Sequence, residues 1–292
     1  MRFAVLIPPP HYAVEWRWAY DMEAGALIAA GAAVTPVPWT DAGGLEAFDL
    51  VLPLVAWGYH QRQAQWLSLL DRFERDGVRV VNPTPLLRWN SDKAYLAELG
   101  AKGIATVPTI AVDSLDETCL ADARERFGCA ELVIKPPISA SAYATYRLRD
   151  GDPFPEQVRG WRMMIQPWVR AILDKGEYSL MFFGGHFSHA VSKVPVDGDF
   201  RVQPEHGGIF IRCEPPDGAE ALAQAALAAA PAEAAYARVD IVVGNDGALQ
   251  IIELELIEPA LFLEHAPDNG RSFAEAILST ARRASKEPLP DR

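Results

Sequence analysis

"GALQIIELELIEPALF", residues 247–262, has the apolar residues of a buried β-strand but carries two glutamates within it. Side chains two residues apart on a strand share one face, so Glu253 and Glu255 are expected to lie side by side. At a separation of roughly 7 Å and an effective dielectric constant of about 20, two bare carboxylates repel each other by about 2 kcal/mol, before any desolvation is counted. The sequence therefore predicts a positive charge between these two acids.

The preceding segment adds a third acid. "YARVDIVVGNDG", residues 236–247, reads as a strand that ends in a turn at Asn245-Asp246-Gly247, so Asp240 and Glu253 meet across a hairpin with Glu255 beside them. Three oxygen donors without Cys or His are the ligands that Mg²⁺ or Mn²⁺ prefers over Zn²⁺, and bound Mg²⁺ commonly carries nucleotide phosphates. A solvated edge strand is the alternative, but the flanking apolar residues indicate burial, where acids need a cation. We expect a metal site at Asp240, Glu253 and Glu255.

Composition narrows the class of partner. The 292 residues are 50% hydrophobic and 23% charged, with a net charge of -12 and no block rich in Lys or Arg, which argues against nucleic acid and anionic membranes as partners. Three widely spaced cysteines fit a reducing cytosol, and the start of the chain does not read as a signal peptide. We expect a cytoplasmic enzyme, and homodimers are common among such enzymes.

The first 80 residues alternate between strand and helix patterns, which predicts a small parallel α/β domain. We expect strands at 3–7, 33–38, 49–55 and 78–81, with helices at 13–30 and 60–76 between them. Ligands in such sheets lie beyond the carboxyl ends of the strands, where this chain has two loops rich in proline and aromatic residues. Candidate substrate contacts there are His11, Tyr12, Glu15, Trp57 and Tyr59, although aromatic packing over a domain boundary would explain them equally well.

The second half is richer in antiparallel signals. We expect a hairpin that turns at Gly184-Gly185, a second one at 245–247, and strands at 131–136 and 163–169. Helices are expected at 92–99, capped by Asn90 or Ser91, near 116–127, and at 217–230. The fold class predicted from these patterns is α/β, with α+β character in the second half.

Basic side chains in or beside these elements provide positive charges for a nucleotide: Lys93, Lys135, Lys193, Arg201 and Arg238. Any one of them could be a solvated surface residue, although the neighbours of Lys135 in "LVIKPP" are apolar. No GxxxxGK[ST], strand-linked GxGxxG or GxSxG motif occurs, so the P-loop, Rossmann and hydrolase-elbow signatures are missing. "QPWV", residues 166–169, could hold an adenine against Trp168, or its Trp and Pro could simply pack in a strand.

The order and spacing of these pieces resemble the ATP-grasp superfamily of carboxylate-amine ligases, in the branch of glutathione synthetase, D-alanine-D-alanine ligase and the cycloserine synthetase-like cyclo-ligases. The resemblance covers about residues 82–292, with a preceding α/β domain like the one such enzymes carry. It implies an N-terminal domain at 1–85 and an ATP-grasp domain at 86–292, with a mobile lid subdomain at about 110–167.

The resemblance also implies roles for individual residues. Lys93 and Lys135 match two nucleotide lysines, Glu177 matches the acid that holds the ribose, and Arg201 matches an arginine that faces the transferred phosphate. Lys193 and Arg238 would offset phosphate charge. The adenine site would be formed by Gln166, Pro167, Trp168 and Val169, and the metal strands by Asp240, Glu253 and Glu255.

Two departures from the family pattern stand out. The loop after Lys135 is normally rich in glycine, but here it reads "PPISASAYATY", so that phosphates would be capped by backbone amides around Ser139 and Ser141. Glu255 replaces the common Asn, which adds a negative charge and resembles the "ELELIEP" form of the cycloserine synthetase-like sequences.

The activity implied by the resemblance is ATP- and Mg²⁺-dependent (or Mn²⁺-dependent) activation of a small amino-acid-like carboxylate as an acyl phosphate, followed by attack of an amine, either between molecules or within one. A small-molecule kinase on the same fold, or a nucleotide-binding module without turnover, are the alternatives. ATP consumption that depends on a carboxylate would favour the ligase.

Overall fold

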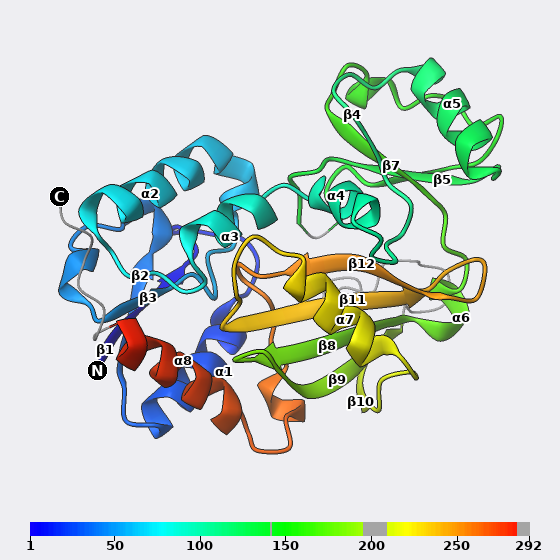
Figure 1. Ribbon diagram of the computed structural model, residues 1–292. Coiled ribbons are helices and arrows are strands. Elements are labelled where there is room, and N and C mark those ends of the chain that lie inside the picture. Colours follow the sequence, from blue (N-terminus) through cyan, green and yellow to red (C-terminus); the bar gives the residue numbers. More distant parts are fainter. Residues whose placement is uncertain (141, 195–208, 285–292) are drawn as a thin grey trace.

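A computed structural model of the chain describes residues 1–140, 142–194 and 209–284. It contains three sheets with helices packed around them (Figure 1). The fold class is the predicted mixture of a parallel α/β unit and antiparallel sheets.

The first sheet is parallel, with strand order β2-β1-β3. Its strands are β1 (Arg2–Ile7), β2 (Ala33–Pro38) and β3 (Leu50–Leu52), and its main helices are α1 (Arg17–Ala29) and α2 (Gln63–Asp76). The strand predicted at 78–81 is reduced to a single bridge between Val51 and Val80. The chain leaves the sheet there: the Asn82 side chain donates to the carbonyls of Tyr236, in the central sheet, and of Leu256, just beyond that sheet, and Pro83 has no N–H to donate.

The central sheet has five antiparallel strands in the order β10-β9-β8-β11-β12. Their bounds are β8 (Glu177–Phe183), β9 (His186–Val194), β10 (Ile209–Cys213), β11 (Tyr236–Val243) and β12 (Leu249–Glu255). The predicted turns at 184–185 and 245–247 join β8 to β9 and β11 to β12. Alternate residues of each strand face opposite sides, and helix α7 (Ala219–Ala228) packs on one of these faces. The opposite face is apolar at one end, where Met181, Phe183 and Tyr236 join a separate core, and polar at the other.

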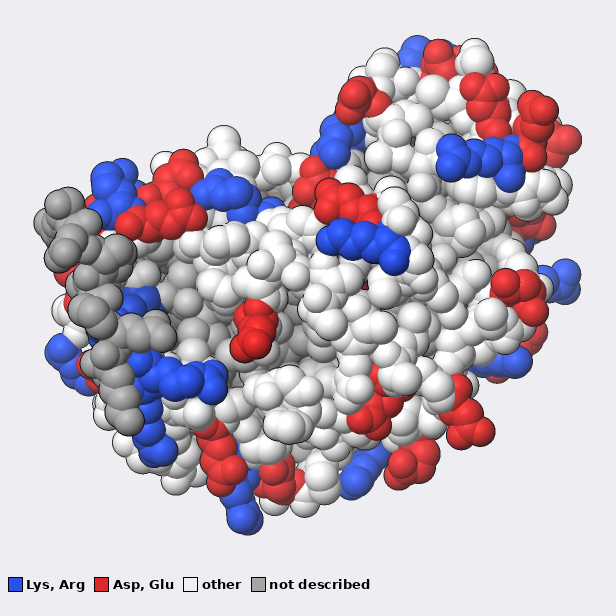
Figure 2. All heavy atoms as spheres, in the orientation of Figure 1, with Lys and Arg blue, Asp and Glu red and all other residues white. Residues whose placement is uncertain are grey.

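The third sheet forms a small lobe with strand order β4-β7-β5-β6. It consists of β4 (Ile110–Val112), β5 (Leu132–Lys135), β6 (Tyr146–Leu148) and β7 (Met163–Pro167), covered by α5 (Glu117–Phe127). Asp116 caps α5 by accepting the Cys119 N–H, and Gly128 ends it in the left-handed conformation that glycine favours. Figure 2 shows the small lobe standing out from the body of the molecule.

Three further helices and one short helical turn connect the sheets. Helices α3 (Thr84–Asn90) and α4 (Tyr95–Ala101) join the first sheet to the small lobe, α6 (Ile172–Lys175) precedes β8, and α8 (Arg271–Ala284) ends the described chain. Phe273 and Ile277 of α8 share a core with Phe3 of the first sheet and Tyr236 of the central sheet. The sequence prediction did not include α8, which fills the space between these two sheets beside α1 (Figure 1).

The prediction that Asn90 or Ser91 caps a helix beginning at residue 92 is wrong. Asn90 is instead the last residue of α3, and α4 begins at Tyr95. The Asn90 side chain is buried and donates to the Leu254 carbonyl while accepting from the Leu256 N–H. The Asn90 amide therefore binds the backbone at the end of β12. Its oxygen is occupied there, so it does not cap a helix.

Candidate active site

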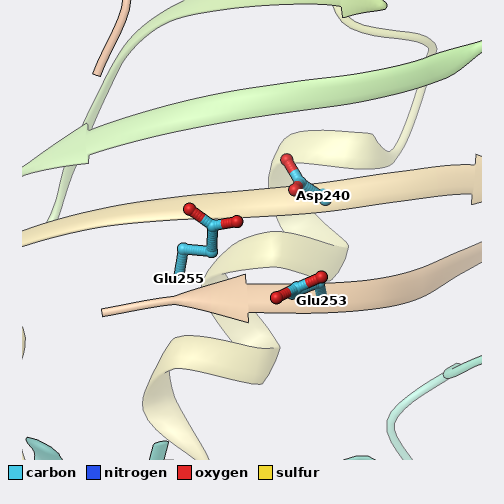
Figure 3. Close-up of side chains that lie close together, drawn as sticks. All are labelled: Asp240, Glu253 and Glu255. Carbon is cyan, nitrogen blue, oxygen red and sulfur yellow. The ribbon is translucent and has the colours of Figure 1, made fainter. Parts of the chain in front are cut away.

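Three carboxylates converge on the face of the central sheet that lies away from α7 (Figure 3). Asp240 of β11 pairs in register with Glu253 of β12, and Arg238 pairs with Glu255, so that all four side chains share this face. One oxygen of each acid lies within 4.8 Å of one oxygen of each of the others. This all-oxygen donor set fits a hard divalent cation such as Mg²⁺ or Mn²⁺.

Basic side chains already lie among these acids. The Arg238 guanidinium is 2.9 Å from Asp240 and also forms an ion pair with Glu255, while Lys193 bridges Asp240, at 3.1 Å, and Glu177. The Ser179 hydroxyl donates a further hydrogen bond to Asp240. These contacts agree with the expectation that acids in a strand like β12 need positive charge beside them.

The acids differ in how readily they ionise. Burial disfavours the charge of Asp240, but Arg238 and Lys193 outweigh it and hold the pKa of this carboxyl well below its usual range. Burial, reinforced by Glu253, raises the pKa of Glu255 to about 7 although Arg238 opposes the shift. Because the described cations do not fully offset the buried acids, the site has room for more positive charge.

The acids line a cavity of about 510 Å³ between the first sheet, the central sheet and the small lobe. All described residues that were predicted to bind the nucleotide or its phosphates also line it: Lys93, Lys135, Lys193, Arg238, Ser139, Gln166, Pro167, Trp168, Val169 and Glu177. Ser141 and Arg201 lie outside the described residues. Tyr12, Glu15, Trp57 and Tyr59 also line the cavity, whereas His11 lines a smaller neighbouring hollow.

One end of the cavity is an apolar slot below the small lobe. Val107, Val169, Ile172 and Val242 form a buried cluster with Ile252 against it. Next to them the Arg147 guanidinium covers the Trp168 ring at 4.2 Å from its centroid, and Trp168 is only 6% exposed. This end has the flat, apolar walls that a nucleobase needs.

Lys135 reaches the same end from β5, and the described residues offer it no ion-pair partner. Burial lowers the pKa of its ammonium group to about 8, although Glu253 acts in the opposite direction. A buried cation without a carboxylate partner is costly. Its position therefore suits an anion that arrives with a ligand.

The loop after Lys135 is bound to α3–α4 through Lys93. The Lys93 ammonium group donates to the Ser139 carbonyl at 2.7 Å, and the Lys93 N–H donates to the Pro137 carbonyl at 2.8 Å. Ser139 is buried, and its hydroxyl donates to the Pro136 carbonyl. Side-chain and backbone contacts thus fix the start of this glycine-poor loop.

The bends usually made by glycine are made here by alanine. Ala142 and Ala144 have φ angles of +54° and +49°, in the left-handed region that L-residues rarely adopt. The loop therefore reaches the cavity, where Ala140, Ala142 and Thr145 line the wall, without the glycines that the family pattern led us to expect.

The opposite end of the cavity is aromatic and acidic. Four residues that the sequence did not single out line it: His60, Phe210, Glu258 and Phe262. Asn90, which the sequence indicated only as a helix cap, also lines the cavity. Glu258 could have been identified from the sequence as a candidate site residue, since it lies three residues after Glu255, where the acidic strand ends. Burial lowers the pKa of the His60 imidazole to about 4, assisted by the charge of Lys93, so His60 is neutral at pH 7.

Charged residues are distributed unevenly over the surface. Figure 2 shows acidic and basic side chains on the small lobe and along the outer edge, with few over the middle of the same face, where α7 lies. The acids of the site instead lie on the inner face of the sheet (Figure 3). Within the described residues, no helix combines the length and apolar composition needed to cross a bilayer.

Comparisons with known proteins agree on one group of relatives. Residues 13–82 match the family model of the N-terminal domain of D-cycloserine synthetase DcsG. The cycloserine biosynthesis protein DcsG of Streptomyces lavendulae is 32% identical over 251 residues, which cover 79% of this chain and 82% of that protein.

Solved structures extend the likeness to the whole fold. The crystal structure of D-cycloserine synthetase DcsG matches with a TM-score of 0.81 and 28% identity, over 97% of this chain and all of that one. D-alanine–D-alanine ligase from Bacillus anthracis matches with a TM-score of 0.69 and 17% identity, over 98% and 99% of the two chains, which shows a shared fold. From its sequence identity and its fold together, the chain belongs to the DcsG family of ATP-grasp ligases, enzymes that use ATP to form carbon–nitrogen bonds.

Proposed function

We propose that this protein uses ATP to phosphorylate the carboxylate of a small amino-acid-like substrate and then joins the resulting acyl group to a nitrogen nucleophile, with release of ADP and phosphate. The observation that carries the proposal is the meeting, in one cavity, of three oxygen-donor acids with the cations Lys93, Lys135, Lys193 and Arg238. Such a site can position phosphates and neutralise charge that develops during phosphoryl transfer.

In this proposal the nucleotide occupies the end of the cavity below the small lobe. The adenine lies in the apolar slot by Gln166, Pro167, Trp168 and Val169, the ribose contacts Glu177, and the phosphates extend past Lys135 and the backbone around Ser139 and Ser141. Lys135 supports this placement of the phosphates, because its ammonium group is partly desolvated and has no ion-pair partner among the described residues, so that phosphate would supply one. Residues 1–85 would then be the preceding domain, and 110–167 the lid of the ATP-grasp domain at 86–292.

The carboxylates of Asp240, Glu253 and Glu255 would hold Mg²⁺ or Mn²⁺ beside the phosphates. When bound, the metal supplies positive charge to the β- and γ-phosphates and fixes their geometry. Lys93 already reaches Glu253 at 2.8 Å, which leaves its ammonium group close to the expected position of the phosphates. Lys193, Arg238 and Arg201 would balance charge on the transferred group.

The reaction takes place in two steps. An oxygen of the substrate carboxylate attacks the γ-phosphorus, so that the bond to ADP breaks and an acyl phosphate forms. The nitrogen then attacks the acyl carbon, loses a proton, and phosphate leaves. Water would hydrolyse the acyl phosphate, so the enclosed position of the cavity between three sheets favours the productive reaction.

We further propose that the nitrogen belongs to the same molecule as the carboxylate, so that a ring closes. Support comes from the relatives, a cycloserine biosynthesis protein and a D-cycloserine synthetase, since cycloserine is a cyclic compound. The cavity volume of about 510 Å³ must also accommodate ATP, which leaves space for a small substrate.

A coupled ADP-release screen over amino acids, their O- and N-substituted derivatives and dipeptides tests the proposal, with hydroxylamine added to trap acyl phosphates as hydroxamates. We expect carboxylate-dependent ADP release and hydroxamate, both lost in Glu253→Gln. A phosphorylated product that needs no amine would instead identify a kinase. Tight ATP binding without turnover across the panel would identify a binding module.

A further inference from the structure

Glu258 occupies a distinctive position at the aromatic end of the cavity. It lies three residues beyond Glu255, where β12 has ended, and its side chain is partly buried and lines the cavity wall. The Trp57 indole N–H donates to the Glu258 backbone carbonyl at 3.3 Å, so a loop of the first sheet holds this residue in place. The carboxylate therefore projects from a fixed backbone.

The nearby cations are already paired with other acids. Lys93 pairs with Glu253, Lys193 with Glu177 and Asp240, and Arg238 with Asp240 and Glu255. Across the described residues, the Glu258 carboxylate has no ion pair and no hydrogen bond to another side chain, and its own backbone N–H is the one hydrogen-bond donor found for it there. Among the cavity residues described, Glu258 is thus an acid without a cationic partner, and Lys135 is a cation without an anionic partner.

The surroundings of Glu258 suit a small organic cation. Trp57 and Trp18 form a tilted ring pair with centroids 6.0 Å apart, and Tyr59 is buried in the same wall. Aromatic faces attract ammonium groups, and a carboxylate beside them adds a direct ion pair. Burial, reinforced by Glu255, raises the pKa of Glu258 to about 8, a cost that a bound ammonium group would offset.

We propose that the Glu258 carboxylate binds the ammonium group of an amino-acid substrate whose own carboxylate is directed toward the Asp240–Glu253–Glu255 site. This inference rests on the proposed function and makes it more specific, because it requires a free amino group on the molecule that is activated. Two ionisable groups without an ion-pair partner among the described residues then mark different parts of the cavity, Lys135 for the nucleotide and Glu258 for the amino acid.

The test compares pairs of ligands that differ in the amino group alone: alanine with lactate and serine with glycerate, both enantiomers of each. Their binding is measured by calorimetry with Mg²⁺ and a non-hydrolysable ATP analogue present. We expect the wild-type protein to bind at least one amino acid about tenfold or more tightly than its hydroxy acid. Glu258→Gln should remove this preference while leaving the affinity for the ATP analogue unchanged.

Glu264→Gln provides the matched control, since Glu264 is an exposed acid outside the cavity. It should retain the preference for amino acids. Equal binding of amino and hydroxy acids by the wild-type protein, no binding of any amino acid, or a preference that survives in Glu258→Gln would overturn the inference. In turnover assays, a lower kcat at unchanged KM in Glu258→Gln would also overturn it, since that result indicates proton transfer rather than recognition.

The two proposals fail in different ways. If amino acids bind through Glu258 but neither ADP nor hydroxamate is released, the ammonium site stands and the ligase chemistry is wrong. If hydroxamate forms equally well from amino and hydroxy acids, the ligase chemistry stands and the ammonium site is wrong.

Discussion

The ammonium group of Lys93 lies 2.8 Å from the Glu253 carboxylate and, on its other side, 2.7 Å from the Ser139 carbonyl. One side chain thus joins the acidic strand of the central sheet to the loop of the small lobe. Burial lowers the pKa of Lys93, but Glu253 more than reverses the effect, and the group stays charged at neutral pH. The Lys93 ammonium group is therefore held in position before a nucleotide phosphate binds.

Lys93→Met should therefore weaken ATP binding in the presence of Mg²⁺ by about 10- to 100-fold, because a charged hydrogen bond to phosphate and the alignment of the loop are both lost. Isothermal titration with a non-hydrolysable ATP analogue measures the change. Lys102→Met is the matched control, since Lys102 is exposed and contacts the Ala229 carbonyl outside the cavity. Equal affinities in the two variants would show that Lys93 does not contact the nucleotide.

The lowered pKa of Lys135, about 8, predicts that ATP affinity falls as pH rises through 8. Below this pH the ammonium group is charged and attracts phosphate; above it the neutral amine does not. Titrations of the ATP analogue between pH 6.5 and about 9.5 should follow this loss in the wild-type protein and show a much flatter profile in Lys135→Met. An affinity that is constant over this range would contradict the assignment.

The same substitution should stabilise the protein without ligand by about 1–3 kcal/mol at pH 7, because it removes a desolvated charge that has no ion-pair partner in the part of the chain that the structure describes. The pKa of Lys135 is lower in the folded chain than its ordinary 10.5, so the unfolded chain binds more protons between pH 8 and 10.5. Wild-type stability should therefore rise toward that of Lys135→Met over this interval. Urea unfolding at pH 7 and 10 measures both effects, with Lys175→Met, at an exposed position, as the control.

Asn90→Ala should destabilise the fold and disturb the site together. The buried side chain bonds both the Leu254 carbonyl, at 2.8 Å, and the Leu256 N–H, at 2.9 Å, next to the two glutamates of β12. Its loss leaves the Leu256 N–H without its partner, at a cost of about 1–3 kcal/mol, while the Leu254 carbonyl still accepts from the Tyr95 hydroxyl. The free energy of unfolding in urea and the rate of ADP release should both fall. The exposed control Gln224→Ala should change neither. An active, fully stable Asn90→Ala would show that β12 needs no such support.

Gly176→Ala should displace β9 at Lys193. Gly176 has a φ of +70°, and an added Cβ would lie 2.3 Å from the Lys193 carbonyl oxygen. Gly185 also has a positive φ, +81°, but has open space around it, so Gly185→Ala measures the backbone strain alone, about 1 kcal/mol. In thermal or urea unfolding, we expect Gly176→Ala to lose several times more stability than Gly185→Ala. We also expect Gly176→Ala to bind ATP more weakly. Equal losses in the two variants would mean that the close approach at Gly176 is easily relieved.

The acidic centre was predictable from the sequence because the three acids lie on two strands that a short turn joins. Alternation along β12 places Glu253 and Glu255 on one face, and the short turn at 245–247 brings β11 beside them. The exact pairing of Asp240 with Glu253 depends on a register shift between Asp240 and Ile241, which counting from the turn does not give. The order of the lysines and the QPWV segment then indicated which residues surround the acids. The shared face of the two glutamates and the order of the basic residues can both be read from the sequence, because they depend on residues that are close together along the chain.

Features that depend on tertiary contacts were missed. Asn90 looked like a helix cap because a capping residue is identified from its neighbours in sequence, whereas its partners, Leu254 and Leu256, lie more than 160 residues away. The sequence of the amphipathic helix α8 does not indicate that this helix packs between the first and the central sheet. In the loop after Lys135, the left-handed conformations of Ala142 and Ala144 are set by the surrounding structure rather than by residue type.

The central claim, that the carboxylate of the substrate takes the γ-phosphate of ATP in this cavity, is tested most directly by oxygen transfer. An active substrate from the ADP-release screen is prepared with ¹⁸O in its carboxylate, and the released phosphate is examined by mass spectrometry. Our account predicts that each phosphate carries one ¹⁸O from the carboxylate and that Glu253→Gln releases almost none. Phosphate that contains oxygen from water or ATP alone would contradict it.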